Sequence, residues 1–110
     1  PYTTLFRSLR WSSAGHYPPA IIFEPNQPPK ILNTSSFPLG LTEDLEVEEY
    51  ECVLSRQARF IICSDGALEP YVGGLNEQFE QLVYHLQNQS FKAPEHVADD
   101  IAILSLCRLN

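Results

Sequence analysis

The sequence has few basic residues and no long apolar run. Seven lysine and arginine residues stand against fourteen aspartate and glutamate residues, which gives a formal net charge of −7. A balance this acidic argues against a nucleic-acid-binding surface. No apolar run approaches the ~20 residues that a membrane-spanning helix needs, so we expect no membrane contact from this segment. The acidity fits a divalent-cation site as well as it fits ordinary solubility.

Cysteine is also scarce, and its spacing fits neither a zinc site nor a disulfide framework. The three cysteines, Cys52, Cys63 and Cys107, are far apart and lie within apolar runs. An odd count without a zinc pattern indicates reduced thiols in the core of a cytoplasmic protein.

The length of 110 residues suits one domain or a piece of one. Residues 1–8, PYTTLFRS, match the translation of a widely used sequencing adapter. We therefore expect this segment to be non-native, although a genuine edge strand is the alternative. The protein sequence then occupies residues 9–110 and is expected to be truncated upstream.

The hydrophobic periodicity predicts an α+β fold, mostly strand with one amphipathic helix. The helix is expected over residues 75–89, where Leu75, Phe79 and Leu82 fall at helical spacing and Asn76 is a plausible N-cap. Such a helix must cover one face of a sheet. Strands are expected within residues 9–13, 20–25, 30–33, 45–54, 59–63 and 99–109.

Two aspartates are expected at one edge of this sheet. The apolar run 60–63 is followed by Asp65 and Gly66, a pair that commonly forms a turn. The alternative is that the strand places the Asp65 carboxylate at a sheet edge where a cation is held. Asp99 and Asp100 precede the last strand. If these two strands are antiparallel neighbours, Asp65 and Asp99 converge. Carboxylates about 4–5 Å apart repel by roughly 3–4 kcal/mol at an effective dielectric of about 20, so they need a proton or a cation between them.

Hard oxygen ligands of this kind favour Mg²⁺ or Mn²⁺. The alternative is that Asp99 caps a turn and Asp100 faces solvent. Spacing alone leaves both interpretations open.

Four sequence blocks, taken in order, resemble a known family. They are SSAGHYPPAII, FPLGL, FIICSDGALE and DDIAILSL, at residues 12–22, 37–41, 60–69 and 99–106. In this order they resemble the SpoIIE-like phosphatases of the PPM family, which are bacterial serine/threonine phosphatases related to protein phosphatase 2C. The resemblance runs from about Leu9 to Leu109. It implies the C-terminal half of a PPM-type antiparallel β-sandwich flanked by helices, with the N-terminal half missing.

The resemblance also implies roles for individual residues. Asp65 and Asp99 match family positions that bind a pair of Mg²⁺ or Mn²⁺ ions, with Gly66 as backbone beside the metal. Glu69 and Asp100 are expected to support the ligands without contacting the ions. His16 is either a proton-transfer group or a turn histidine that fixes the local backbone. The implied reaction is metal-assisted hydrolysis, in which a metal-activated water attacks phosphorus.

The family's N-terminal half, which carries another metal-binding aspartate, has no counterpart in this chain. We therefore expect the fragment to be inactive and its parent to be a metal-dependent protein serine/threonine phosphatase in bacterial signal transduction. By analogy, the parent acts as the output domain of a response regulator or sensor on a phosphorylated anti-sigma-factor antagonist. The alternative is a catalytically inactive adaptor domain of a response regulator. A half-domain exposes strand edges, so we also expect a dimer or an aggregate.

Overall fold

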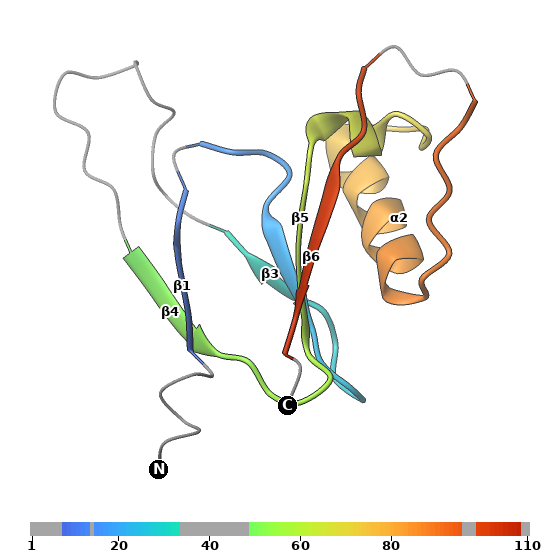
Figure 1. The fold of residues 1–110 in the computed structure, drawn as a ribbon. Coiled ribbons are helices and arrows are strands. Elements are labelled where there is room, and N and C mark those ends of the chain that lie inside the picture. The colour runs from blue at the N-terminus through green and yellow to red at the C-terminus, as the bar shows by residue number, and fades with distance from the viewer. Residues whose placement is uncertain (1–7, 14, 34–48, 96–98, 109–110) are drawn as a thin grey trace, which may run out of the picture.

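The computed structural model describes residues 8–13, 15–33, 49–95 and 99–108. These residues form an α+β structure of antiparallel strands and helices, as predicted (Figure 1). The elements are β1 (Ser8–Ser12), β2 (Ala20–Phe23), β3 (Lys30–Leu32), β4 (Glu49–Val53), β5 (Arg59–Cys63), the 3₁₀ helix η1 (Asp65–Leu68), α2 (Leu75–Gln87) and β6 (Ile103–Cys107). Of the segment expected to be adapter-derived, residues 1–7 lie outside the described residues, and Ser8 opens β1.

The strands form two antiparallel sheets. β1 pairs with β4, and a four-stranded sheet has the order β3-β2-β5-β6. β2 and β3 pair as an antiparallel hairpin, with Ile21 opposite Ile31. The other side of β2 pairs with β5, where Ile21 lies opposite Ile61. β5 and β6 are antiparallel neighbours, with Cys63 opposite Ile103. This pairing meets the condition under which Asp65 and Asp99 were expected at one edge of the sheet.

The four-stranded sheet is the central layer, because its residues alternate between two apolar clusters. On one face, Ile21 and Ile61 are buried with Leu82 and Leu86 of α2. On the other face, Phe60 is buried in a cluster against which residues of β1 and β4 pack. Figure 1 accordingly shows α2 and the β1–β4 pair on opposite sides of the central sheet. Each fully buried side chain of this size contributes roughly 1.5–3 kcal/mol.

The helix α2 confirms the predicted helical period but not its predicted start. Its N-cap is Gly74, whose carbonyl accepts the first helical hydrogen bond from Gln78 at 2.9 Å. Asn76 is therefore inside the first turn and was wrongly predicted as the cap. Leu75, which the period placed on the buried face, is 62% exposed. No helix within the described ranges is both long and apolar enough to cross a membrane.

All three cysteines are free thiols, as the sequence predicted, but they do not share a core position. Cys63 is buried, Cys52 is half-buried and Cys107 is exposed. The prediction of a core thiol is wrong for Cys107, because β6 is one of the two outer strands of the four-stranded sheet that the described residues form. All five residues of that strand are exposed.

Candidate functional site

The strand β5 fixes the position of the backbone just before Asp65. It is the central buried strand, paired on both sides, and Asp65 follows it after a single residue, Ser64. The chain then continues as η1 rather than as the predicted tight turn. In that helix the amide of Ala67 donates to the carbonyl of Ser64 at 3.1 Å, and Glu69 donates to Gly66 at 3.2 Å. Asp65, the first residue of η1, is exposed.

The segment that contains Asp99 and Asp100 lies beside this strand end. The Ser64 amide donates to the carbonyl of Ala102 at 2.9 Å. The Ala102 amide donates to the Ser64 hydroxyl at 2.9 Å, and this hydroxyl donates to the Asp100 carbonyl at 3.2 Å. These bonds extend the β5–β6 pairing and place both acidic segments at one edge of the sheet. The convergence of the Asp65 and Asp99 carboxyl groups themselves stays a prediction.

Gly66 is required by close packing between the two segments. A Cβ atom at residue 66 would overlap the carbonyl oxygen of Asp100 and lie 3.4 Å from that of Asp99. Left-handed φ angles occur at Gly15 and Gly73, so they do not explain the glycine at 66. The predicted reason, a tight turn, is therefore replaced by the approach of a second backbone.

The acidic side chains at this edge are accessible. Asp65, Glu69, Asp99 and Asp100 are all exposed. One carboxylate oxygen of Asp99, Oδ1, accepts the amide of Asp100 at 2.8 Å, which matches the alternative of Asp99 as a local cap. The cap and a cation-binding role are compatible, because a carboxylate offers about four lone-pair sites.

The oxygen donors at this edge are of the type that Mg²⁺ or Mn²⁺ prefers, but there are few of them. Carboxylate and carbonyl oxygens are the ligands that these hard cations prefer. In the parts of the chain that the structure describes, no group of three His, Cys, Asp or Glu side chains could hold a metal ion. The described residues therefore contribute at most part of a metal site at this edge.

His16 is hydrogen-bonded to the strand that leads to Asp65. Its Nε2 lies 2.9 Å from the carbonyl oxygen of Cys63. Because a carbonyl can only accept, Nε2 carries the proton in this contact. The bond ties the connection between β1 and β2 to the end of β5, two residues before Asp65. This contact supports the backbone-fixing interpretation of His16.

Of the other histidines, His85 lies in the last turn of α2 and makes local contacts there. Its Nδ1 lies 2.9 Å from the Ser90 hydroxyl, and its ring stacks on Tyr71 with centroids 5.4 Å apart. His96 lies outside the described residues.

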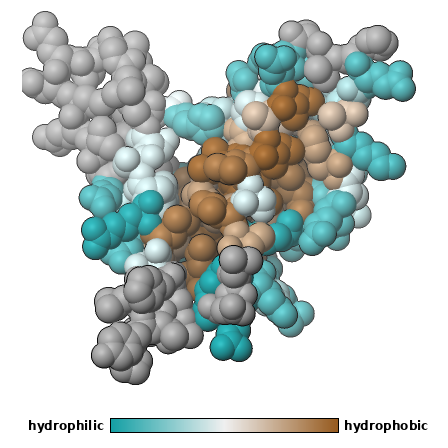
Figure 2. All heavy atoms as spheres, in the orientation of Figure 1, coloured by the Kyte–Doolittle hydropathy of each residue, from teal (hydrophilic) through white to brown (hydrophobic). Residues whose placement is uncertain are grey.

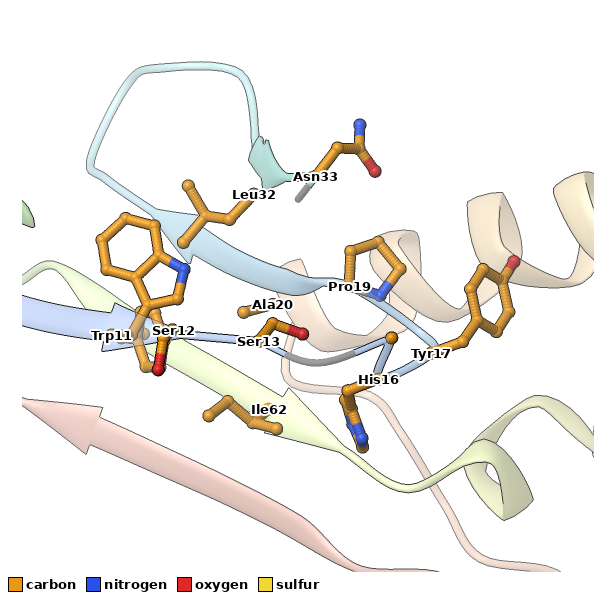
Figure 3. A pocket seen from close by; sticks show the side chains of 12 residues that line it. Trp11, Ser12, Ser13, His16, Tyr17, Pro19, Ala20, Leu32, Asn33 and Ile62 are labelled. Carbon is orange, nitrogen blue, oxygen red and sulfur yellow. The ribbon is translucent and has the colours of Figure 1, made fainter. Parts of the chain in front are cut away.

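A pocket of about 370 Å³ lies beside the loop that carries His16. Figure 3 shows Trp11 at one end and His16 and Tyr17 at the other. Ile62 and Phe60 of β5 supply apolar lining. The Trp11 indole N–H is buried and, among described groups, has no hydrogen-bond acceptor. The sequence did not predict this pocket because its walls come from separate strands; the block at residues 12–22 was the one signal near it.

Comparison with protein-family models gives a match over residues 2–109 to the family described as Stage II sporulation protein E (SpoIIE). Comparisons with curated proteins and with solved structures gave no significant match. The family match covers nearly the whole chain and includes all four sequence blocks noted above.

Proposed function

Because the chain belongs to the SpoIIE family, whose members are PPM-type phosphatases, we propose that its parent hydrolyses phosphoserine or phosphothreonine with Mg²⁺ or Mn²⁺. The single observation that carries the proposal is the Ser64 network. Its hydroxyl binds both the Asp100 carbonyl and the Ala102 amide, and so holds two acid-bearing segments at one edge.

In this proposal Asp65 and Asp99 hold the metal ions. Bound ions supply Lewis-acid polarisation of phosphoryl oxygens and a water of lowered pKa. Ser64 and Gly66 set the separation of the two segments, and the Asp100 amide orients the Asp99 carboxylate through Oδ1. The exposure of both aspartates is compatible with a phosphorylated side chain that a protein substrate presents.

The 110-residue chain is expected to bind metal weakly and to turn over poorly by itself. Two carboxylates leave most of the coordination sphere of a metal pair to water or to other protein groups. We infer that the parent supplies these groups and acts in the bacterial cytoplasm, as the output domain of a response regulator or sensor, on a phosphoprotein such as an anti-sigma-factor antagonist. The three free thiols support a reducing compartment.

The test is phosphate release from a phosphoserine or phosphothreonine protein by the full-length parent with added Mn²⁺. Asp65→Asn and Asp99→Asn are each expected to lower kcat/KM by at least about 100-fold, since removal of a metal ligand exceeds the 10–100-fold effect of groups behind the ligands. Glu80→Gln, an exposed acid on α2, is the matched control and should leave the rate unchanged.

Residues behind the ligands should have smaller effects. Asp100→Asn and Glu69→Gln are each expected to lower kcat/KM by about 100-fold at most. Phosphatase activity that survives chelation and both ligand substitutions would contradict the proposal. Metal-independent binding of a partner without turnover would instead indicate the adaptor.

A further inference from the structure

The pairing of β5 with β6 changes at Ser64, where a side chain replaces a main-chain group. The register of the two strands puts Ser64 opposite Ala102, one step beyond Cys63 and Ile103. The Ser64 amide donates to the Ala102 carbonyl at 2.9 Å. In regular antiparallel pairing the Ala102 amide would return this bond to the Ser64 carbonyl. The Ala102 amide donates instead to the Ser64 hydroxyl, also at 2.9 Å.

The Ser64 carbonyl, which this replacement releases from the sheet, begins the next element. It accepts the amide of Ala67 at 3.1 Å and so closes the first turn of η1. The backbone of Ser64 itself is still extended, with φ −74° and ψ 162°. A single residue therefore ends the strand pairing and starts the 3₁₀ helix, and the amides of Ala67 and Ala102 both keep an acceptor.

The replacement occurs where the apolar part of β5 ends. Phe60, Ile61 and Cys63 are buried, whereas Ser64 is half-buried and Asp65 is exposed. Figure 2 shows apolar residues gathered in the middle of the view, where Figure 1 places β5 and β6. Because packing fixes the backbone up to Cys63, the contacts of Ser64 decide where the chain goes next.

The position of Asp65 depends on this choice of acceptor. Without the hydroxyl, the Ala102 amide of the neighbouring strand and the Ala67 amide of the following turn compete for the Ser64 carbonyl. If the strand pairing wins, β5 continues and the register puts Asp65 opposite Ile101 instead of at the start of η1. If the helix wins, the Ala102 amide loses its acceptor within the protein, which is costly for a main-chain group.

The same hydroxyl reaches Asp99 through one intervening residue. The Ser64 hydroxyl donates to the Asp100 carbonyl at 3.2 Å. The Asp100 amide donates in turn to Oδ1 of Asp99 at 2.8 Å. Asp100 is therefore held at its carbonyl by Ser64 and at its amide by Asp99. Since Asp65 directly follows Ser64 in the chain, one hydroxyl group adjoins both acidic segments.

We propose that Ser64 is the positioning residue of the acidic edge: its hydroxyl replaces a main-chain acceptor and thereby sets the places of Asp65 and Asp99 for metal binding. The metal-binding part rests on the proposed function, whereas the replacement of the acceptor does not. The role requires a hydroxyl group on Cβ. Threonine meets this requirement, and valine, which has the shape of threonine without the hydroxyl, does not.

Amide hydrogen exchange in the 110-residue chain tests the replacement without any metal. In Ser64→Val, the amide of Ala102 or of Ala67 should exchange about tenfold faster relative to amides in the middle of β5, because one hydrogen bond is lost. Ser64→Thr should keep the wild-type rates at both amides. Equal rates in the valine and threonine variants would overturn the proposal, because a role in filling space does not distinguish these side chains.

Mn²⁺ binding to the full-length parent, followed by electron paramagnetic resonance of the free ion, tests the effect on the ligands. Ser64→Val should raise the Mn²⁺ dissociation constant about 10-fold to 100-fold, the range for groups that orient metal ligands. Ser64→Thr should restore the wild-type constant. Ser55→Ala is the control, because it removes an exposed hydroxyl that donates to Glu24 at 3.0 Å ahead of the other end of β5. This variant should leave the constant unchanged.

These measurements separate the role of Ser64 from the proposed function. They are made where circular dichroism shows every variant to be folded, so that a loss of stability alone does not change the Mn²⁺ dissociation constant. A wild-type parent that binds no Mn²⁺ would contradict the proposed function and, with it, the assignment of Ser64 to metal binding. A parent that binds Mn²⁺ equally well with valine and with threonine at residue 64 would overturn this inference alone.

Discussion

The backbone of Gly66 packs so closely against the carbonyl group of Asp100 that residue 66 has no room for a Cβ atom. This contact sets how closely the segment after β5 can approach the segment before β6. The hydrogen bonds of the Ser64 hydroxyl to Asp100 and Ala102 oppose their separation. The sequence feature that first suggested a turn is thus a packing requirement between residues that are far apart in the chain.

Gly66→Ala should lower the free energy of unfolding by about 1–3 kcal/mol, the usual cost of overpacking a buried site. The reason is that the added methyl group must displace the carbonyl of Asp100, which is backbone and cannot rotate away. Urea unfolding followed by circular dichroism measures the change. The same variant in the parent should bind Mn²⁺ more weakly, because the acidic segments are forced apart.

Gly74→Ala is the matched control for Gly66→Ala. Nothing lies within 4 Å of a Cβ atom at residue 74, and its φ of −71° is accessible to alanine. The loss of a favourable N-cap residue and the lower entropy of the unfolded chain should nearly cancel. If both alanine variants unfold at the same urea concentration, close packing at Gly66 does not explain its identity.

The placement of the acidic edge was predictable from the sequence because it depends on strand pairing. The apolar run before Asp65 and the apolar run after Asp99 each predict a strand, and antiparallel pairing of consecutive strands brings their facing ends together. What the sequence did not predict is the side chain that joins them. Ser64 contacts a backbone group 38 residues away, and serine at the end of a strand carries no signal of such a partner.

His16 shows the same limit for a candidate site residue. Its contact with the Cys63 carbonyl spans 47 residues, so spacing could not choose between a proton-transfer role and a backbone role. The exposure of β6 is a further case, because an apolar strand sequence predicts a strand but not whether a neighbour covers it. Side-chain burial depends on which strand is outermost, and pairing order is a property of the whole fold.

Substitution of His16 separates its two candidate roles. If its function is to donate to the Cys63 carbonyl, His16→Ala should destabilise the chain by about 0.5–1.5 kcal/mol. His16→Gln, which keeps an N–H donor on a side chain of similar reach, should recover much of that loss. In the parent, phosphatase activity should follow stability, with the glutamine variant close to wild type. Equal loss of activity in both variants, with stability recovered in the glutamine variant, would indicate proton transfer instead.

The start of α2 gives a prediction about helix capping. Asn76 lies inside the first turn, where alanine is a better helix former by a few tenths of a kcal/mol. Asn76→Ala should therefore raise the free energy of unfolding slightly, as measured by thermal unfolding. Had Asn76 been the N-cap, the same change would cost about 1 kcal/mol, so a loss of that size would contradict the observed start of the helix at Leu75.

The buried thiol of Cys63 makes stability depend on alkaline pH. Burial raises the pKa of Cys63 from 9.0 to about 11. The unfolded chain therefore releases this proton at a lower pH than the folded chain does. The resulting stabilisation is fully present below about pH 9 and is lost as the pH rises toward 11. Burial also raises the pKa of Cys52 and Tyr71, so these groups add a change of the same sign.

Urea unfolding at pH 8 and at pH 10.5 measures this dependence. Cys63→Ala should lower stability at pH 8, because it leaves a small cavity, and should also reduce the further loss between the two pH values. Cys107→Ser keeps the buried thiol and should show the full wild-type decrease. The comparison uses the difference in the free energy of unfolding between the two pH values within each variant, so the cost of the cavity cancels. A Cys63→Ala variant that loses as much stability as wild type over this range would mean that the Cys63 proton is released at the same pH in the folded and unfolded chains.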